Sequence, residues 1–304
     1  MRPGAKCGKQ TVNLILTVLE IVAPVFLLAA VGFIWVKTGG EYRIAFVTRL
    51  AMTLAVPALV FTALMKTEIE PAALTALTLA SLAGYGALTL VFYATARLMG
   101  LDMRTYLAPL IFGNTGNLGL PLALFAFGEA GLGLAVIVFA VMAIWSFTFG
   151  VWVVAGGGSP VKALKEPLVW ATLLGGLFLW QGWETPRFLT NALELLGQLA
   201  IPLMLITLGV ALARLHPAGL GRAFALSLVK VVVAVAVGWA VGSAFGLAPV
   251  PMAVLVIQLA TPVAVTAYML AEKYGADSAS VAGLVVTSTL LSVVTIPLLI
   301  GFLI

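Results

Sequence analysis

A polar, glycine-rich stretch interrupts the fourth long apolar run of the chain and reads Gly113-Asn114-Thr115-Gly116-Asn117-Leu118-Gly119-Leu120-Pro121. Each interior glycine weakens a helix by about 1 kcal/mol relative to alanine, and proline by about 3 kcal/mol, so a continuous helix is not expected here. Inside a lipid bilayer the freed backbone groups need polar partners or a cavity. Asn114, Thr115 and Asn117 supply such partners. A packing seam of small residues is the alternative, although a seam does not require two asparagines.

A second interruption is predicted in the ninth apolar run, at Gln258-Leu259-Ala260-Thr261-Pro262-Val263. Threonine followed by proline is typical of an N-cap and the first helical residue, so we expect a half-helix to start at Pro262. Two broken helices would cross near the middle of the membrane, with their N-terminal dipole ends facing one small volume. Because such a volume offers partial positive charge and neutral donors without a buried cation, it favours an anion.

The rest of the chain has the composition of a membrane protein. Of its 304 residues only 16 are Lys or Arg and 11 are Asp or Glu, whereas 62% are hydrophobic, and the mean hydropathy is +1.18. Charges make up about a quarter of a typical soluble domain. We expect an all-α polytopic membrane protein whose ten transmembrane helices leave no length for a soluble catalytic or nucleotide-binding domain. The predicted spans are 13–36, 44–65, 71–96, 105–127, 130–155, 163–182, 188–213, 222–246, 249–271 and 278–303.

The basic residues lie between the apolar runs, where they indicate topology rather than a nucleic-acid partner. With ten spans, eleven of the 16 Lys and Arg residues collect on one side, which the positive-inside rule makes cytoplasmic. The prediction is a multi-pass protein of the plasma membrane, the inner membrane of a bacterium, with both termini extracytoplasmic. The first span is expected to be retained, because it is long enough to cross the bilayer and lacks a convincing signal-peptide cleavage site.

Glycine and proline landmarks of the first half recur in the second half at offsets of 143 to 147 residues, which predicts an internal repeat. The pairs are Pro24 with Pro167, Pro57 with Pro202, Gly116 with Pro262, and Gly128 with Gly275. Chance alignment is the alternative, because both residue types are common in membrane helices. Five spans per half is an odd number, so the second half must enter the membrane from the opposite side. We therefore expect residues 1–155 and 156–304 to form two inverted five-helix repeats, as in secondary transporters.

Of the ionisable residues inside predicted spans, Glu20 and Lys230 are candidates for coupling, whereas Arg49 and Glu194 lie nearer span ends. Glu20 could carry a coupling proton or lie at the membrane interface without a specific role. Lys230 could attract the anion, although we expect its long stem to extend toward the cytoplasmic interface. Cys7 and His216 are the sole Cys and His of the chain and lie far apart outside the spans. We therefore expect no metal site, no cofactor and no enzyme activity.

Several motifs in this order resemble the auxin efflux carrier family in its bacterial branch. The resemblance rests on the stretch 113–121, on Pro262-Val263-Ala264-Val265-Thr266 and on Ala271-Glu272-Lys273-Tyr274-Gly275. It also includes Pro24 with the following Gly32, and Leu54-Ala55-Val56-Pro57 in the second span. It covers the chain from about Val18 to the C-terminus.

The resemblance implies a ten-helix carrier, similar in fold to bile acid/sodium symporters, in which spans four and nine are broken and cross. Spans one, two, six and seven would form a scaffold that supports a homodimer. Spans three to five and eight to ten would form a transport domain that slides as an elevator. Family members move auxin or small carboxylates such as malonate and malate. By the same likeness, Asn114, Asn117, Gln258 and Pro262 would surround the substrate carboxylate.

Two departures from the family pattern bear on the substrate. Plant relatives have a proline in the first crossover, where this chain has Gly116, and an acidic residue in span three, where this chain has none. A small mono- or dicarboxylate is therefore expected rather than indole acetic acid. Sodium sites in the related symporter fold use carboxylate oxygens, which the crossover region here lacks. We expect no tightly bound sodium, which leaves coupling to protons or transport driven by the membrane potential.

The sequence thus predicts a secondary transporter that exports or exchanges a small organic anion by alternating access, with the anion and the lipid bilayer as its partners and no nucleic acid. An anion channel or uncoupled facilitator is the alternative. An intramembrane enzyme is a further one, although no nucleophile–base or metal-ligand motif is present. The predicted substrate-binding residues are Asn114, Thr115, Gly116, Asn117, Gln258, Thr261, Pro262 and Val263.

Overall fold

The computed structural model describes residues 4–66, 71–157 and 167–303, and within these ranges the chain is helical without any β-strand. Three short π-helical turns, Ala51–Ala55, Thr115–Gly119 and Ser146–Gly150, join neighbouring helices. The helices are α1 (Gly4–Lys37), α2 (Ile44–Leu50), α3 (Val56–Met65), α4 (Pro71–Leu98), α5 (Met103–Ile111), α6 (Leu120–Trp145), α7 (Val151–Ala155), α8 (Pro167–Gln181), α9 (Arg187–Gln198), α10 (Ala200–Arg214), α11 (Leu220–Ala244), α12 (Pro249–Ala260), α13 (Val265–Tyr274) and α14 (Ser278–Leu303).

The helical segments identify a multi-pass membrane protein, as predicted. In the described part of the chain, seven segments are long and apolar enough to cross a membrane. They are Leu16–Lys37, Ile44–Met65, Ala72–Leu98, Thr115–Ala155, Arg187–Arg214, Leu220–Ala244 and Ser278–Leu303. Two further apolar helices, Pro167–Gln181 and Pro249–Ala260, are shorter. The division into ten spans and two inverted repeats stays a prediction.

Gly128 interrupts the longest of these segments. It lies inside α6 with φ 66° and ψ −159°, a backbone conformation that residues with a side chain rarely adopt. The chain therefore changes direction between the spans predicted at 105–127 and 130–155. Gly275, the counterpart of Gly128 in the predicted repeat, ends α13 with a similar φ of 68°. These two landmarks thus share the left-handed φ that favours glycine.

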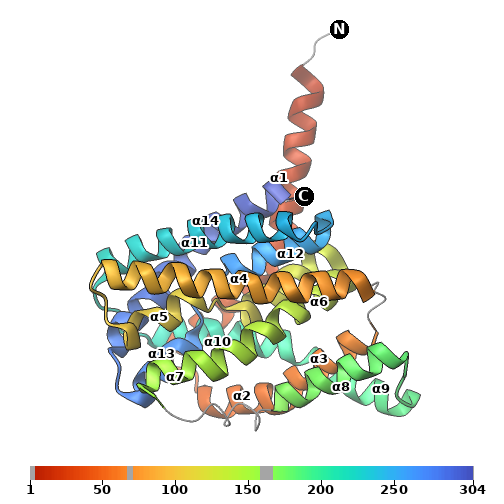
Figure 1. The fold of residues 1–304 in the computed structure, drawn as a ribbon, viewed down its shortest axis with the longest axis horizontal. Coiled ribbons are helices and arrows are strands. Elements are labelled where there is room, and N and C mark those ends of the chain that lie inside the picture. The colour runs from red at the N-terminus through yellow and green to blue at the C-terminus, as the bar shows by residue number, and fades with distance from the viewer. Residues whose placement is uncertain (1–3, 67–70, 158–166, 304) are drawn as a thin grey trace.

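The helices pack in two groups. In the first group, α1 packs against α10, and α3 packs against α8 and α9. In the second group, α11 packs against α4, α12 and α14, α5 packs against α4 and α7, and α6 packs against α4 and α12. Figure 1 shows α2, α3, α8 and α9 together along one edge of the molecule, with α11 and α14 across the opposite side. Contacts of α1 with α14 and of α3 with α6 join the two groups.

Glycine allows the closest approach within the first group, between α1 and α10. A Cβ atom at Gly209 would overlap the carbonyl oxygen of Ala29, and one at Gly32 would overlap that of Ile206. Small residues permit such backbone contact between membrane helices. The α1 helix itself begins at Gly4 rather than at the predicted residue 13, and Figure 1 shows its first turns standing clear of the bundle.

Candidate functional site

Two helices are broken where the sequence predicts interruptions. The first, α5, ends at Ile111, after which Phe112 is extended with φ −94° and ψ 119°, and helical structure resumes at Thr115. The second, α12, ends at Ala260, and the chain stays extended through Ala264 before α13 begins at Val265. Each break therefore frees backbone donors and acceptors inside an otherwise helical protein.

The two breaks satisfy each other's backbone groups. Gly113 and Val263 form an isolated antiparallel bridge, in which the N–H of Asn114 donates to the carbonyl oxygen of Pro262 at 2.6 Å. The N–H of Val263 donates to Ser288 Oγ on α14 at 3.0 Å. A Cβ atom at Gly113 would overlap the Thr261 hydroxyl, so the contact requires glycine there. The place where these two breaks meet, at Gly113-Asn114 and Pro262-Val263, is here called the crossing. Its backbone groups are thus satisfied by hydrogen bonds that need no water.

The predicted half-helix start at Pro262 is wrong, because α13 begins three residues later. The Thr261 hydroxyl donates to the carbonyl oxygen of Gln258 at 2.7 Å and so caps the end of α12 instead of the start of α13. Pro262 remains extended because its carbonyl oxygen accepts the hydrogen bond from Asn114. The first break is also shorter than predicted. Residues 115–121 are helical, and Pro121 lies in the first turn of α6, directly after the π-helical turn Thr115–Gly119.

A cavity of about 560 Å³, here called the inner cavity, lies on one side of the crossing. Three of the eight predicted binding residues line it: Asn114, Gly116 and Asn117. Asn114 is 4% exposed, and its side-chain Nδ2 has no hydrogen-bond partner among the described residues. A buried amide nitrogen without a partner costs about 1–3 kcal/mol, and a ligand that reached this donor would recover that cost. Asn117, which is partly exposed, is the second amide at the wall.

Several residues of the inner cavity are not among the predicted binding residues. Thr266, in the first turn of α13, and Lys273, near its end, line the wall together with Glu272. Both Thr266 and Lys273 belong to motifs that carry the family resemblance. They face the cavity because α13 begins at Val265, a helix start that the sequence did not predict. The other lining residues are mostly apolar, among them Met52, Phe112, Phe139, Met142, Phe147, Met204 and Met269. The cavity therefore suits a small ligand with one polar end.

The remaining predicted residues lie elsewhere around the crossing. Thr261 and Pro262 line a much smaller pocket of about 10 Å³ on its other side. Thr115, Gln258 and Val263 are completely buried in the packing between the helices. Gln258 donates from Nε2 to the carbonyl oxygen of Ala135 at 3.4 Å and fills the space beside Gly119. In this conformation these five residues pack around the crossing and do not line the inner cavity.

The two candidate coupling residues are placed differently from each other. Glu20 is exposed on α1 and does not belong to the described lining of the inner cavity. Lys230 is only 2% exposed, and its Nζ donates to the carbonyl oxygen of Leu110 at 3.1 Å. The expectation that its stem extends to the interface is therefore wrong. The side chain points instead into the helix bundle, because the C-terminal carbonyl groups of α5 offer a partner there.

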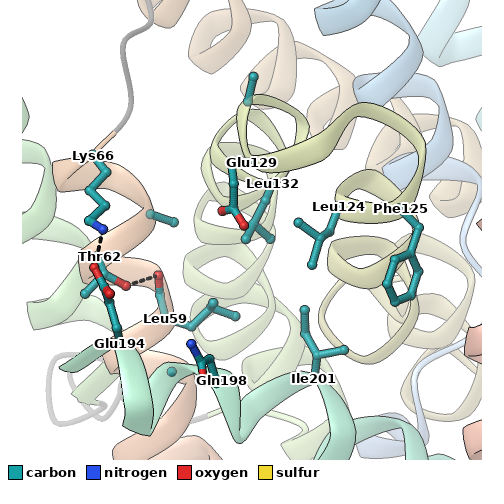
Figure 2. A pocket seen from close by; sticks show the side chains of 13 residues that line it. Leu59, Thr62, Lys66, Leu124, Phe125, Glu129, Leu132, Glu194, Gln198 and Ile201 are labelled. Carbon is teal, nitrogen blue, oxygen red and sulfur yellow. Dashed lines mark hydrogen bonds and ion pairs between the residues drawn. The ribbon is translucent and has the colours of Figure 1, made fainter. Parts of the chain in front are cut away.

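A second large cavity, here called the outer cavity, lies between α3 and α9 on one side and α6 on the other, with a volume of about 790 Å³. Lys66 and Glu194 form an ion pair on the α3–α9 side. Figure 2 shows Glu129, next to the Gly128 interruption, reaching into the cavity from α6 opposite this pair. Figure 2 also shows the polar side chains of Thr62 and Gln198 in the wall. The outer cavity is thus polar on both of its faces.

The two cavities lie at different levels along the part of α6 that follows Gly128. Leu132 lines the outer cavity and Met142 lines the inner cavity, and ten helical residues extend over about 15 Å. Across the described residues, no group of three or more His, Cys, Asp and Glu side chains could hold a metal ion. The chemistry that the geometry offers is therefore binding through amide, hydroxyl and backbone N–H donors.

Known proteins with similar sequences are transporters. A family model described as "Membrane transport protein" matches residues 17–163 and 151–300. A Methanothermobacter thermautotrophicus protein named "Uncharacterized transporter" is 27% identical over 294 residues, which cover 92% of this chain and 96% of that protein. The "Putative malonate transporter" of Rhizobium meliloti is 28% identical over 201 residues, which cover 61% of this chain and 62% of that protein. The chain therefore belongs to the auxin efflux carrier-like family of membrane transport proteins.

Proposed function

We propose that the protein is a secondary transporter that exports or exchanges a small mono- or dicarboxylate by alternating access. The observation that carries this proposal is the inner cavity beside the crossing, with the unpartnered amide of Asn114 and the amide of Asn117 at its wall. Helical structure resumes on both chains immediately after the breaks, at Thr115 and at Val265. The first backbone N–H groups of these helices are additional donors for an anion.

A carboxylate fits this arrangement better than a cation does. The N-terminal ends of two helices carry partial positive charge, and amide nitrogens donate hydrogen bonds. Lys273, whose side chain is exposed at the wall, adds a full positive charge, which Glu272 partly offsets. The apolar part of the wall suits the carbon skeleton of an organic anion.

Alternating access is supported by the two cavities and the two helix groups. The outer cavity separates α3 and α9 from α6, so it lies where the two groups meet. We propose that α1–α3 and α8–α10 form the scaffold and that α4–α7 and α11–α14 move against it as an elevator. In this scheme the ten spans form two inverted repeats, and a homodimer forms through the scaffold.

The relative from Rhizobium meliloti supports the substrate class, because its name refers to malonate. Orientation follows from charge. The inner cavity lies near Lys273, on the side that collects most basic residues in the ten-span scheme, so we propose that it opens to the cytoplasm. Both termini would then be extracytoplasmic, and the membrane would be the plasma membrane.

The proposal is tested by uptake into proteoliposomes. Purified protein is reconstituted, and uptake of labelled malonate and malate is measured against a panel of unlabelled carboxylates, with sodium and pH gradients varied independently. We expect saturable uptake that carboxylates compete for. A conductance that does not saturate would indicate an anion channel instead and would contradict the transporter proposal.

A further inference from the structure

The environment of Lys230 is unusual for a lysine. Among the described residues, Lys230 is the one buried basic side chain, and no Asp or Glu side chain is buried with it. An ionisable group inside a membrane bundle is costly unless it has partners, and it marks functional positions. Its one hydrogen bond in the structure is donated from Nζ to the carbonyl oxygen of Leu110 at 3.1 Å.

The groups around Lys230 are neutral. Its pocket is lined by hydroxyl side chains, including Ser227, Thr261, Ser288 and Ser292. The helix that carries it, α11, packs against α4, α5, α12 and α14. The last two helices contain no titratable side chain. The other helices carry a few titratable groups. On α4, the ring of the buried Tyr85 lies against Phe112 and its hydroxyl has no partner among the described residues, whereas Tyr93 and Arg97 are exposed. On α5, Arg104 binds the carbonyl oxygens of Val154 and Tyr274, and Tyr106 is buried. On α11 itself, Arg222 is exposed.

The ammonium group lies directly behind the anion cavity. Leu110, its acceptor, is in the last turn of α5, where unpaired carbonyl groups carry partial negative charge. Phe112, two residues later, lines the inner cavity, and Cα atoms two residues apart are separated by at most about 7.6 Å. Thr261 and Pro262 of the second break line the pocket of Lys230, while Ala264 lines the inner cavity. The crossing therefore lies between the ammonium group of Lys230 and the inner cavity.

We propose that the ammonium group of Lys230 is a resident counter-cation of the crossing, which stabilises the substrate carboxylate in the inner cavity and takes the place of a free coupling cation. This inference rests on the proposed function for its substrate. Lys230 does not touch the anion and acts through the crossing, so it is a positioning residue. Its ammonium group combines one positive charge with an N–H donor to the end of α5.

The expected size of the effect follows from Coulomb's law. A unit charge at about 10 Å, in a protein with an effective dielectric constant of about 20, changes the affinity for an anion roughly tenfold. We therefore expect Lys230→Met, which removes the charge but keeps the length of the side chain, to raise the KM for the carboxylate roughly tenfold with a smaller change in kcat. Lys37→Met is the matched control, because Lys37 is exposed at the end of α1. It should leave the KM unchanged.

Chemical rescue distinguishes a role of the charge from a role in packing. The Lys230→Ala variant lacks a propylammonium-sized fragment, so n-propylammonium chloride should restore its KM and raise its melting temperature by about 2 °C or more. n-Propanol at the same concentration is similar in size and can donate a hydrogen bond but carries no charge, so it should do neither. The wild-type protein should respond to neither compound. An unchanged KM in Lys230→Met, or a KM of Lys230→Ala that propylammonium does not alter, would overturn the proposal.

A measurement on the wild-type protein keeps the proposal testable even where the variants do not fold. Because the cation is part of the chain, replacing sodium and potassium with choline should change neither the transport rate nor the melting temperature. A requirement for either metal cation would contradict the resident cation. The melting temperatures are measured without substrate, so they test the role of Lys230 even if no carboxylate is transported. Absence of carboxylate transport would count against the proposed function instead.

Discussion

The backbone N–H of Asn114 donates a hydrogen bond of 2.6 Å to the carbonyl oxygen of Pro262, and this bond ties the two broken helices to each other. It leaves the side chain of Asn114 at the wall of the inner cavity and holds Pro262 in the extended conformation that delays α13 until Val265. The geometry of the anion site therefore depends on contacts between the breaks, and the following predictions test those contacts.

The crossing should not tolerate a side chain at Gly113. A methyl group there would overlap the Thr261 hydroxyl and lie 2.9 Å from its carbonyl oxygen. Overpacking of this kind costs about 1–3 kcal/mol, so Gly113→Ala should lower the melting temperature by several degrees and reduce transport. Gly176→Ala on α8 is the control, because the new methyl group meets no atom within 4 Å and alanine favours a helix. Equal melting temperatures for the two variants would show that the breaks are not in close contact.

Removing the amide of Asn117 should impair substrate binding without affecting the fold. Asn117 is partly exposed at the inner cavity, and a hydrogen bond to a charged group contributes about 1.5–3 kcal/mol. We expect Asn117→Ala to lower transport efficiency roughly tenfold to hundredfold at an unchanged melting temperature. Asn191→Ala, at an exposed position on α9, should retain wild-type transport. Full activity of Asn117→Ala would remove this residue from the site.

Gln258→Ala should behave differently from Asn117→Ala, because Gln258 is completely buried and donates to the carbonyl oxygen of Ala135. The substitution removes this hydrogen bond and opens a void beside Gly119, which together cost about 1–3 kcal/mol or more. The expected result is a melting temperature lower by several degrees, measured on detergent-solubilised protein. A variant of wild-type stability that has lost only substrate affinity would place Gln258 in direct contact with the anion instead.

Movement of the two helix groups can be tested by cross-linking across the outer cavity. Phe125 on α6 and Ile201 on α10 both line it (Figure 2). In a Cys7→Ser background, which removes the sole native cysteine, a bifunctional thiol reagent that joins Phe125→Cys to Ile201→Cys should abolish transport until the link is cleaved. The same reagent at Thr185→Cys and Thr190→Cys, two neighbouring positions whose hydroxyl groups lie 2.7 Å apart, should have little effect. Transport that persists through the first cross-link would exclude an elevator movement along this face.

Much of the architecture followed from local sequence chemistry. Glycine, proline and amide residues in an apolar run identify a break because they weaken helices and supply polar partners, and both breaks lie at the predicted positions. The left-handed Gly128 likewise falls between two predicted spans. Asn114 and Asn117 line the inner cavity for the same reason, since polar side chains at a break need a polar or hollow environment.

The errors arose where a residue had partners distant in the sequence. Thr261-Pro262 has the local pattern of a helix start, but the hydrogen bonds of Thr261 to Gln258 and of Pro262 to Asn114 keep it extended. Lys230 has the stem length to reach an interface, but the carbonyl oxygen of Leu110, on another helix, holds it inside. Neither tertiary contact can be deduced from the periodicity of a single segment.

The central claim, that this chain carries a small carboxylate through the site beside the crossing, is tested most directly by counterflow. Proteoliposomes loaded with unlabelled malonate are diluted into labelled malonate, and accumulation of label is compared for wild type, Asn117→Ala and Asn191→Ala. We expect transient accumulation above equilibrium for wild type and Asn191→Ala, and a roughly tenfold or greater loss for Asn117→Ala. Absence of counterflow with every carboxylate tested, from folded wild-type protein, would contradict it.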